Sequence, residues 1–400
     1  MKVALLVVCL GLAACASHSS QTSRRVEFRP WATEMPSGAY EHYIRGRLAV
    51  ERGDHELAIV ELRMASASAG GPVELRIAIV DEMLASGSLH DARAEAEDLT
   101  RDAPREAATW RLLGRARAAL GDARGAAAVL ERAAKLAPED ENAWLMLGAV
   151  RRQLGDDDGA LDAYRALIEH LPQSAEGHFR LGRALAGAGN PDAARAELAR
   201  TIELDPDHID ARVLLADVDR RAGRAGAAQA TLRVAFDRSG SDVTVGERLF
   251  QVLLETGDQA AAAELLRRLD TDWRSTGIRL RIGLLFLQLR LPEDALRTAR
   301  AVLARDPNEQ SAQLVAARAL AQNGRRPEAI ALLREVPQLS HAYVEARAFG
   351  AELYGREGTP HEGLALLAPA LTAPPATRRW STRAPPSRTG LTSPIAPSPS

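Results

Sequence analysis

Two His-Glu pairs come closest, among the residues of this chain, to a metal-dependent active site. A zinc hydrolase of the His-Glu-x-x-His kind needs a second imidazole one helical turn after the first, so that both bind one ion. The pairs are His55-Glu56 and His361-Glu362, but the residues four positions after the histidines are Ile59 and Ala365, which cannot bind metal. Both pairs are therefore interpreted as solvated starts of helices, and the sequence predicts no metal site.

Phosphate and calcium chemistry have no better support. Gly187-Ala188-Gly189 has the spacing that begins the glycine-rich loop of dinucleotide-binding proteins. It falls, however, at the end of an expected helix with no strand before it. Three aspartates at 156–158 lack the shaped loop from which calcium takes six or more oxygens, so helix capping explains them better. No stretch of about 150 residues is left over for a catalytic domain. The sequence predicts neither an enzyme nor a cofactor.

The composition favours a globular protein built from closely packed helices. The chain has 400 residues, of which 46% are hydrophobic and 26% charged, and its formal net charge of −2 gives no sign of nucleic-acid binding. Only 4% of the residues are aromatic, so alanine and leucine must fill most of the core. Small side chains of this kind suit helices that approach each other at short range.

The N-terminus has the pattern of an export signal. Lys2 precedes an apolar run from Val3 to Leu12, which is shorter than the roughly 20 residues of a membrane span. A run of this length is typical of a secretory signal. The only cysteines of the chain, Cys9 and Cys15, lie in this region, so removal of residues 1–14 together with modification of Cys15 would leave no thiol for a disulfide or for catalysis.

The residues that close this signal, Leu12-Ala13-Ala14-Cys15, resemble the lipobox of bacterial lipoproteins. The resemblance implies that residues 1–14 are a signal peptide and that Cys15 receives a diacylglycerol. Ala16, rather than an aspartate, follows the cysteine, which implies an outer-membrane anchor facing the periplasm. An ordinary signal, or a cytoplasmic protein with a misassigned start, remains the alternative.

The rest of the chain divides into three parts. Residues 15–38 lack periodicity and are interpreted as a flexible tether, and residues 373–400, rich in proline, serine and arginine, as a disordered tail. Residues 39–372 contain an internal repeat of 34 residues. Its clearest marker is a ladder of positions, the first seven and the last three at intervals of 34: Gly53, Gly87, Gly121, Gly155, Gly189, Gly223, Gly257, then, after one deletion, Arg290, Gly324 and Gly358. Five residues after each lies an alanine, or Gly363 in the last copy.

These repeats resemble the tetratricopeptide repeat, a helix–turn–helix unit of 34 residues. The clearest copies are residues 110–138, 144–172 and 178–206, and the first supplies Trp110, Leu113-Gly114, Gly121, Ala126, Leu130, Ala133 and Pro138 of the pattern. The resemblance predicts an all-α, right-handed α-solenoid of about ten repeats. The aromatic residue usual three positions after Leu-Gly is replaced here by Arg117, Arg151, Leu185 or Asp219.

The two glycines of a repeat have different expected roles. Gly114 is expected where the first helix crosses the second, opposite Ala126, because a missing side chain lets the backbones approach. Gly121 is expected to end the first helix in a left-handed conformation, which costs little only for glycine. Asp122 then caps the second helix by accepting from its free N–H groups. The same glycine-aspartate pair recurs at 53–54, 155–156 and 257–258.

The family resemblance also implies a binding surface. In tetratricopeptide arrays the first helices line a concave groove, and fixed positions on them point into it. Mapped onto this chain, the positions give a mostly basic track that includes Arg111, Arg115, Arg152, Gln153, Phe179, Arg183, Arg220 and Arg221. Arginine can hold a carboxylate with two hydrogen bonds, so an acidic or C-terminal peptide is the expected guest. The alternative is a solvated face whose arginines pair with nearby carboxylates. The equivalent positions of the later repeats include Leu280, Leu284 and Leu287, a more apolar segment that is either part of the groove or buried.

The sequence as a whole predicts a non-catalytic scaffold that binds protein partners in the bacterial envelope. Proteins of this architecture help to assemble pili and secretins, outer-membrane proteins, exopolysaccharide or peptidoglycan machinery, and the sequence does not choose among them. The alternative class is an envelope enzyme whose repeats form a substrate-binding arm. Partner identity and oligomeric state stay open.

Overall fold

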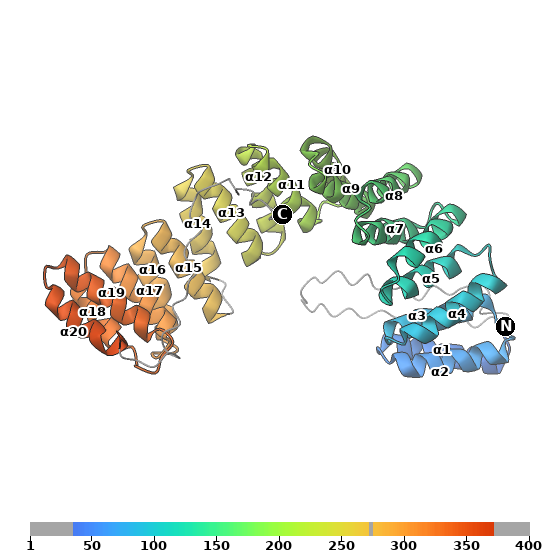
Figure 1. Cartoon of the computed structure of the whole chain (residues 1–400), viewed down its shortest axis with the longest axis horizontal. Coiled ribbons are helices and arrows are strands. Elements are labelled where there is room, and N and C mark those ends of the chain that lie inside the picture. Colours follow the sequence, from blue (N-terminus) through green and yellow to red (C-terminus); the bar gives the residue numbers. More distant parts are fainter. Residues whose placement is uncertain (1–34, 272–274, 372–400) are drawn as a thin grey trace, which may run out of the picture. The chain divides into compact units, whose positions relative to one another are not determined.

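The computed structural model describes residues 35–271 and 275–371, and these form twenty α-helices and no strand (Figure 1). Helix contacts divide the chain into two compact units, with the boundary after Pro172. The first unit contains α1 (Ser37–Glu51), α2 (His55–Ser68), α3 (Val73–Ala85), α4 (Leu89–Asp102), α5 (Ala107–Ala119), α6 (Ala123–Leu136), α7 (Glu141–Gln153) and α8 (Asp157–His170).

The second unit continues the same alternation of helices. Its elements are α9 (Ala175–Gly187), α10 (Pro191–Leu204), α11 (Ile209–Arg221), α12 (Ala225–Arg238), α13 (Val243–Glu255), α14 (Gln259–Thr271), α15 (Thr276–Gln288), α16 (Pro292–Leu303), α17 (Gln310–Gln322), α18 (Arg326–Arg334), α19 (Tyr343–Arg356) and α20 (Pro360–Leu371). Odd-numbered helices are the first and even-numbered helices the second of each pair. Within each unit consecutive helices pack together, and the α-solenoid predicted from the repeats is confirmed.

The turns between paired helices follow the predicted ladder. Nine glycines of the ladder, from Gly53 to Gly358, have φ between +73° and +83°, and Asp54, Asp122, Asp156 and Asp258 each accept a hydrogen bond from the backbone three residues on. Arg290 occupies the one ladder position that lacks glycine, and it adopts the same left-handed conformation with φ +58°. The repeat geometry therefore holds an arginine in a backbone conformation that its side chain disfavours.

The close approach of paired helices depends on a glycine in the first helix. A Cβ on Gly114 would lie 2.5 Å from Cγ of Leu130, and Gly46 and Gly182 lie in the same way against Leu62 and Leu198. The side chain that covers Gly114 is that of Leu130, one turn after the Ala126 expected opposite it, and in the equivalent repeat the Ala194 carbonyl also lies 3.3 Å from a Cβ on Gly182. Helical side chains lean toward the N-terminus of their helix, so the residue one turn later covers the glycine. Ala126 is nevertheless fully buried, as predicted.

A hydrogen bond at the start of a repeat explains two further positions of the pattern, the tryptophan of the first helix and the proline that closes the preceding repeat. Trp144 donates its indole N–H to the carbonyl of Pro138 at 3.0 Å, and Trp110 does the same to Pro104. In a later repeat the side-chain amide of Gln313 replaces the indole and donates to the Pro307 carbonyl at 3.2 Å. In each case the acceptor lies six residues before the donor, so the bond fixes how the inter-repeat loop enters the next helix.

Ion pairs take the place of the aromatic residue that the repeats lack. Arg117 donates to Glu97 at 3.3 Å, and Arg151 donates to Glu131 at 3.1 Å. The side chain of Asp219 is only 2% exposed and accepts from Arg195 at 3.0 Å and Arg224 at 2.7 Å. Three of the four departures from the family pattern are thus compensated by charge pairing, and Leu185 is the exception.

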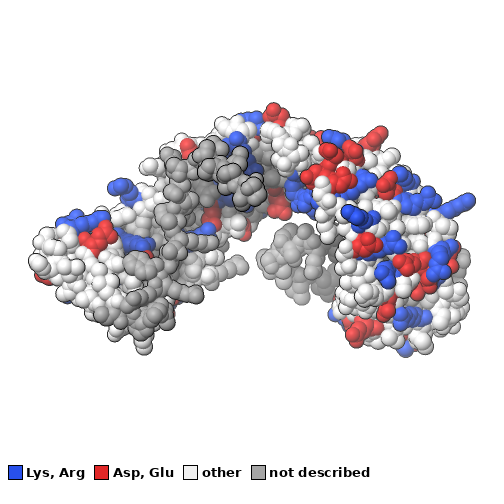
Figure 2. All heavy atoms as spheres, in the orientation of Figure 1, with Lys and Arg blue, Asp and Glu red and all other residues white. Residues whose placement is uncertain are grey.

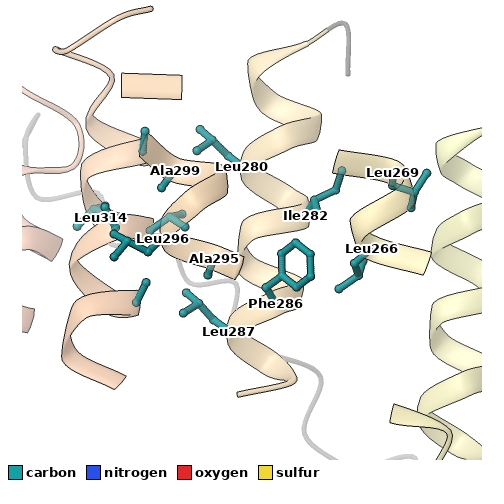
Figure 3. Close-up of a cluster of buried hydrophobic side chains, with 14 of the residues drawn as sticks. Leu266, Leu269, Leu280, Ile282, Phe286, Leu287, Ala295, Leu296, Ala299 and Leu314 are labelled. Carbon is teal, nitrogen blue, oxygen red and sulfur yellow. The ribbon is translucent and has the colours of Figure 1, made fainter. Parts of the chain in front are cut away.

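The core of the second unit is apolar and continuous from α11 to α19. Figure 3 shows the central part of it: Ile282 and Phe286 of α15 point toward Leu266 and Leu269 of α14. Leu280 and Leu287 point from the other side of α15, toward α16 and α17. Since α15 buries residues on both sides, only one narrow face of this helix is left for solvent or a ligand.

Several predicted features lie outside the described residues. They are the signal peptide (1–14), the lipidation site Cys15, most of the tether (15–38) and the tail (373–400). Of the tether, only residues from Met35 onward are described, and α1 already begins at Ser37. No helix in the two described ranges is long and apolar enough to cross a membrane.

Candidate peptide-binding surface

The candidate surface lies on the first helix of each repeat. Residues 34 apart occupy equivalent places on neighbouring first helices, as Arg183 of α9 and Asp217 of α11 do, or Leu284 of α15 and Arg318 of α17. First helices of neighbouring repeats contact each other directly in both units, among them α3 with α5 and α15 with α17. Side chains at these places therefore form a surface that runs from repeat to repeat within a unit.

In the first unit, the four predicted groove residues fall into two groups. Arg111 is paired with Asp140 at 2.8 Å, and Arg115 is paired with Asp81 of α3 at 2.7 Å. Arg152 and Gln153, at the end of α7, are exposed. Arg152 has no hydrogen-bond or ion-pair partner within the described part of the chain. Of the four, Arg152 is thus the cation that a ligand would meet unneutralised.

Ion pairs between successive first helices neutralise much of the predicted basic track. In addition to Asp81–Arg115, Arg220 of α11 pairs with Glu255 of α13 at 3.2 Å, and Glu247 of α13 pairs with Arg281 of α15 at 2.7 Å. Figure 2 shows basic and acidic side chains interspersed on the face it presents. The paired-arginine alternative therefore accounts for Arg111, Arg115 and Arg220, which leaves fewer free cations than the sequence suggested.

The predicted groove residues of the second unit lie on α9 and α11. Phe179 is 8% exposed, and its ring packs against His208 with ring centroids 4.5 Å apart. The guanidinium of Arg183 stacks over the same ring at 5.6 Å. Because Phe179 is buried, little of its ring is available to a ligand. Arg183 and Arg221 instead border a pocket.

This pocket, the α9–α11 pocket, has a volume of about 390 Å³. Its charged lining residues are Arg183, Arg221 and Asp217, and Asp217 also pairs with Arg248 at 2.6 Å. Leu214 and Val218 supply part of the apolar wall. The pocket therefore presents both signs of charge around a small apolar floor.

A second and larger pocket, the α15–α19 pocket, has a volume of about 480 Å³ and was not singled out from the sequence. It lies between the first helices α15, α17 and α19. Its apolar lining residues are Leu284, Leu287, Ala321, Phe349 and Leu353. Leu284 is 42% exposed, whereas Leu280 and Leu287 are each 8% exposed, so of the three leucines named from the sequence one is open to solvent.

The polar lining of the α15–α19 pocket is entirely cationic or neutral: it consists of Arg318, Arg326, Arg356, Gln288 and Gln322. Arg318 pairs with Glu345 and Arg356 with Glu352, each at 2.5 Å. Arg326 is half-buried and has no charged partner in the described ranges. The sequence signal that would have found this pocket is the groove-facing register applied to the last three repeats.

Two carboxylates near these surfaces have perturbed acidity. Burial raises the pKa of Glu176 in α9, but hydrogen bonds from His208 and Arg180 outweigh it and hold the pKa below its usual value. Burial likewise raises the pKa of Asp294 in α16, and the hydrogen bonds from Arg267 and Arg297 bring it below the usual range. Both groups are thus held as anions by arginine, a structural arrangement and not a proton-transfer site.

Sites for metal chemistry are absent from the described residues, where no group of three His, Cys, Asp or Glu side chains could hold an ion. His55 begins α2, as the sequence predicted, and its Nδ1 lies 2.8 Å from Glu82 Oε2. Asp156 caps α8 through the backbone N–H of Gly159. Among the residues that resembled ligands in the sequence, His55 and Asp156 therefore have structural partners.

Two family models, both described as tetratricopeptide repeat, match the sequence. One matches residues 77–140, 111–175 and 280–344, and the other matches residues 152–218 and 185–244. Together they account for more than half of the chain, so the chain belongs to the tetratricopeptide-repeat family. The comparison with curated proteins gives no significant match.

Several solved structures are similar to this chain. One is a tetratricopeptide repeat protein from Parabacteroides merdae, with 16% identity over 62% of this chain and 98% of that one and a TM-score of 0.42. PilW, described as a widely conserved type IV pilus biogenesis factor, has 17% identity over 50% and 93% of the two chains and a TM-score of 0.42. A MamA protein has 22% identity over 42% and 92%, with a TM-score of 0.37. Likenesses of this size concern the fold and not the function.

Proposed function

We propose that this chain is a non-catalytic adaptor, anchored through a lipid on Cys15 to the periplasmic side of a bacterial outer membrane, which gathers protein partners on its first helices. The tetratricopeptide repeats make it a protein-interaction scaffold. One observation carries the choice of surface: residues one repeat apart line open pockets on neighbouring first helices. The lipobox-like residues 12–15 support the anchor. Processing would remove Cys9 and lipidation would occupy Cys15, so the mature protein would have no cysteine for a disulfide.

The partners are proposed to be proteins of an envelope assembly. Unpaired arginines on the first helices, Arg152 in the first unit and Arg221 in the second, are exposed and suited to carboxylates. Exposed charges of this kind contribute more to the choice and rate of association than to its free energy. The adaptor is thus expected to favour partners with acidic segments.

The surface is tested by affinity capture from envelope membranes with the full-length protein. Arg152→Glu and Arg221→Glu are the test variants. Arg132→Glu on α6 and Arg233→Glu on α12 are matched controls, because these arginines are exposed on second helices of the same units. We expect the test variants to lose partners that the controls retain. Equal partner sets in all four variants would contradict the groove proposal.

The anchor is tested separately by mass spectrometry of the mature N-terminus. A diacylated Cys15 is expected, and Cys15→Ser should release the protein from the membrane fraction. An intact Met1 would contradict the lipoprotein assignment and leave the scaffold function to be sought elsewhere in the cell.

A further inference from the structure

We propose that the α15–α19 pocket binds a peptide segment of a partner protein in which a large apolar side chain lies next to a carboxylate. This inference deepens the proposed function, since it assumes that the first helices receive partners. The inference differs from the proposed function in the location of the site and in its chemistry. The site lies in the last three repeats, and an apolar side chain of the peptide provides the main contact.

The apolar part of the pocket is exposed without being needed for the core. Leu284 is 42% exposed on α15, although Leu280 and Leu287, one turn before and after it, are buried. Half-buried Phe349 of α19 lies across the same pocket, and Leu287 and Leu353 form its base. The apolar surface therefore stays open to solvent. The volume of the cavity, about 480 Å³, lies in the range usual for ligand pockets, about 300–1,000 Å³.

The charged part of the pocket selects an anion. Three arginines line it and no carboxylate does. Glu345 and Glu352 each engage an arginine of the rim, but Arg326 is left without an acidic partner among the described residues. The α9–α11 pocket differs in having Asp217 in its lining, so it offers no comparable preference. A guanidinium beside an apolar floor suits a carboxylate that follows or precedes an apolar side chain.

The chain's own C-terminal tail does not fit this description. Residues 372–400 contain Arg378, Arg379, Arg383 and Arg388 and no acidic side chain. Like charges on the tail and on the pocket rim disfavour their association. The occupant is therefore assigned to another protein.

The probe for the test is a phage-displayed library of random 12-residue peptides selected on the full-length protein. Wild type should enrich peptides with an aromatic or large aliphatic residue adjacent to Asp or Glu. An enriched peptide is then synthesised with a fluorescent label, and its dissociation constant is measured by anisotropy. We expect Leu284→Glu and Arg326→Glu each to weaken binding at least tenfold, and the milder Leu284→Ser to weaken it about fivefold.

The leucine control is matched in exposure and the arginine control in charge. Val234 of α12 is 44% exposed, so Val234→Glu repeats the Leu284 change on another face, and Arg233→Glu repeats the Arg326 change. Both should leave the dissociation constant unchanged. The enriched peptide is made with a free C-terminal acid and with a C-terminal amide, which distinguishes binding of a terminal carboxylate from binding of an acidic side chain. A carboxylate contact is supported if the binding of either peptide depends on Arg326.

Three results would overturn the inference: no enrichment of acidic-apolar peptides, binding that survives both pocket variants, or pocket-dependent binding to vesicles of phosphatidylglycerol instead of peptide. The outcome is separable from that of the proposed function. Peptide binding at this pocket without envelope partners would reject only the envelope role. Envelope partners that depend on Arg152 and Arg221 but not on Leu284 would reject only the pocket assignment.

Discussion

The ring of Tyr164 on α8 lies directly against the backbone of Gly148 on α7. A Cβ at Gly148 would overlap ring atoms of Tyr164, and that side chain is only 1% exposed, so it has no free space into which to move. Gly46, Gly114 and Gly182 stand in the same relation to a leucine sixteen residues later. In these four repeats, one missing side chain thus sets the distance between the paired helices.

Gly148→Ala is expected to lower the free energy of unfolding by about 1–3 kcal/mol, because the methyl group overpacks the helix crossing. Gly226→Ala on α12 is the control: it is a helical glycine with open space where its Cβ would be, so the same change should raise stability by up to about 1 kcal/mol. Urea denaturation monitored by circular dichroism measures both. Equal effects would show that the crossing is looser than the contact between Gly148 and Tyr164 implies.

Arg290→Gly is expected to stabilise the protein. Arg290 holds φ +58° at a turn where every other repeat has glycine, and a left-handed non-glycine residue costs about 1–2 kcal/mol. Glycine loses more entropy on folding, so a net gain of about 0.5–1 kcal/mol is expected. The reciprocal change, Gly324→Arg, places an arginine at φ +78° and should be destabilising. A drop in melting temperature for Arg290→Gly would mean that the arginine side chain has a stabilising role of its own.

Asp219→Ala is expected to cost about 3 kcal/mol, because it removes a buried carboxylate that holds Arg195 and Arg224. Asp192→Ala is the matched control: Asp192 also contacts Arg224, at 3.2 Å, but its side chain is 85% exposed. An exposed pair contributes well under 1 kcal/mol. Thermal denaturation of both variants distinguishes the buried pair from the exposed one, and similar losses would argue against a structural role for Asp219.

Asp294 predicts a specific dependence of stability on pH. Its pKa in the folded protein is held below the usual value by Arg267 and Arg297, in spite of burial. The stabilisation from this group is therefore present above the pKa of the unfolded chain and is lost as pH falls through the lower folded pKa. The stability difference between wild type and Asp294→Asn should be larger at pH 7 than at pH 3. A difference that stays constant over this range would refute the assignment.

The repeat register could be read from the sequence because it depends on the smallest residues. The ladder of glycines and the alanines five residues later predicted which positions turn and which are buried, and the left-handed φ values and the buried Ala126 and Ala160 agree with it. Which side chain covers Gly114 depends on the lean of Leu130 on the facing helix, and spacing along the sequence does not give that geometry.

The surface was harder to predict than the register. A helical position tells which way an arginine points, but not which carboxylate of the next repeat meets it, and Arg111, Arg115 and Arg220 proved to be paired. Leu284 was named from the sequence, but its exposure stayed open, because a leucine in an apolar helix has the same pattern whether it faces the core or solvent. Only the packing of α15 between α14 and α17 separates the two cases.

The two pockets of the second unit lie on first helices of one continuous stack, and they differ in charge. A partner chain that carried two anchors could occupy both at once, and its second contact would then form at a high effective concentration. Two contacts of modest affinity would then give a much higher overall affinity. Because the α9–α11 pocket has Asp217 in its lining and the α15–α19 pocket has no carboxylate, such a bivalent guest would also bind in a single direction along the repeats.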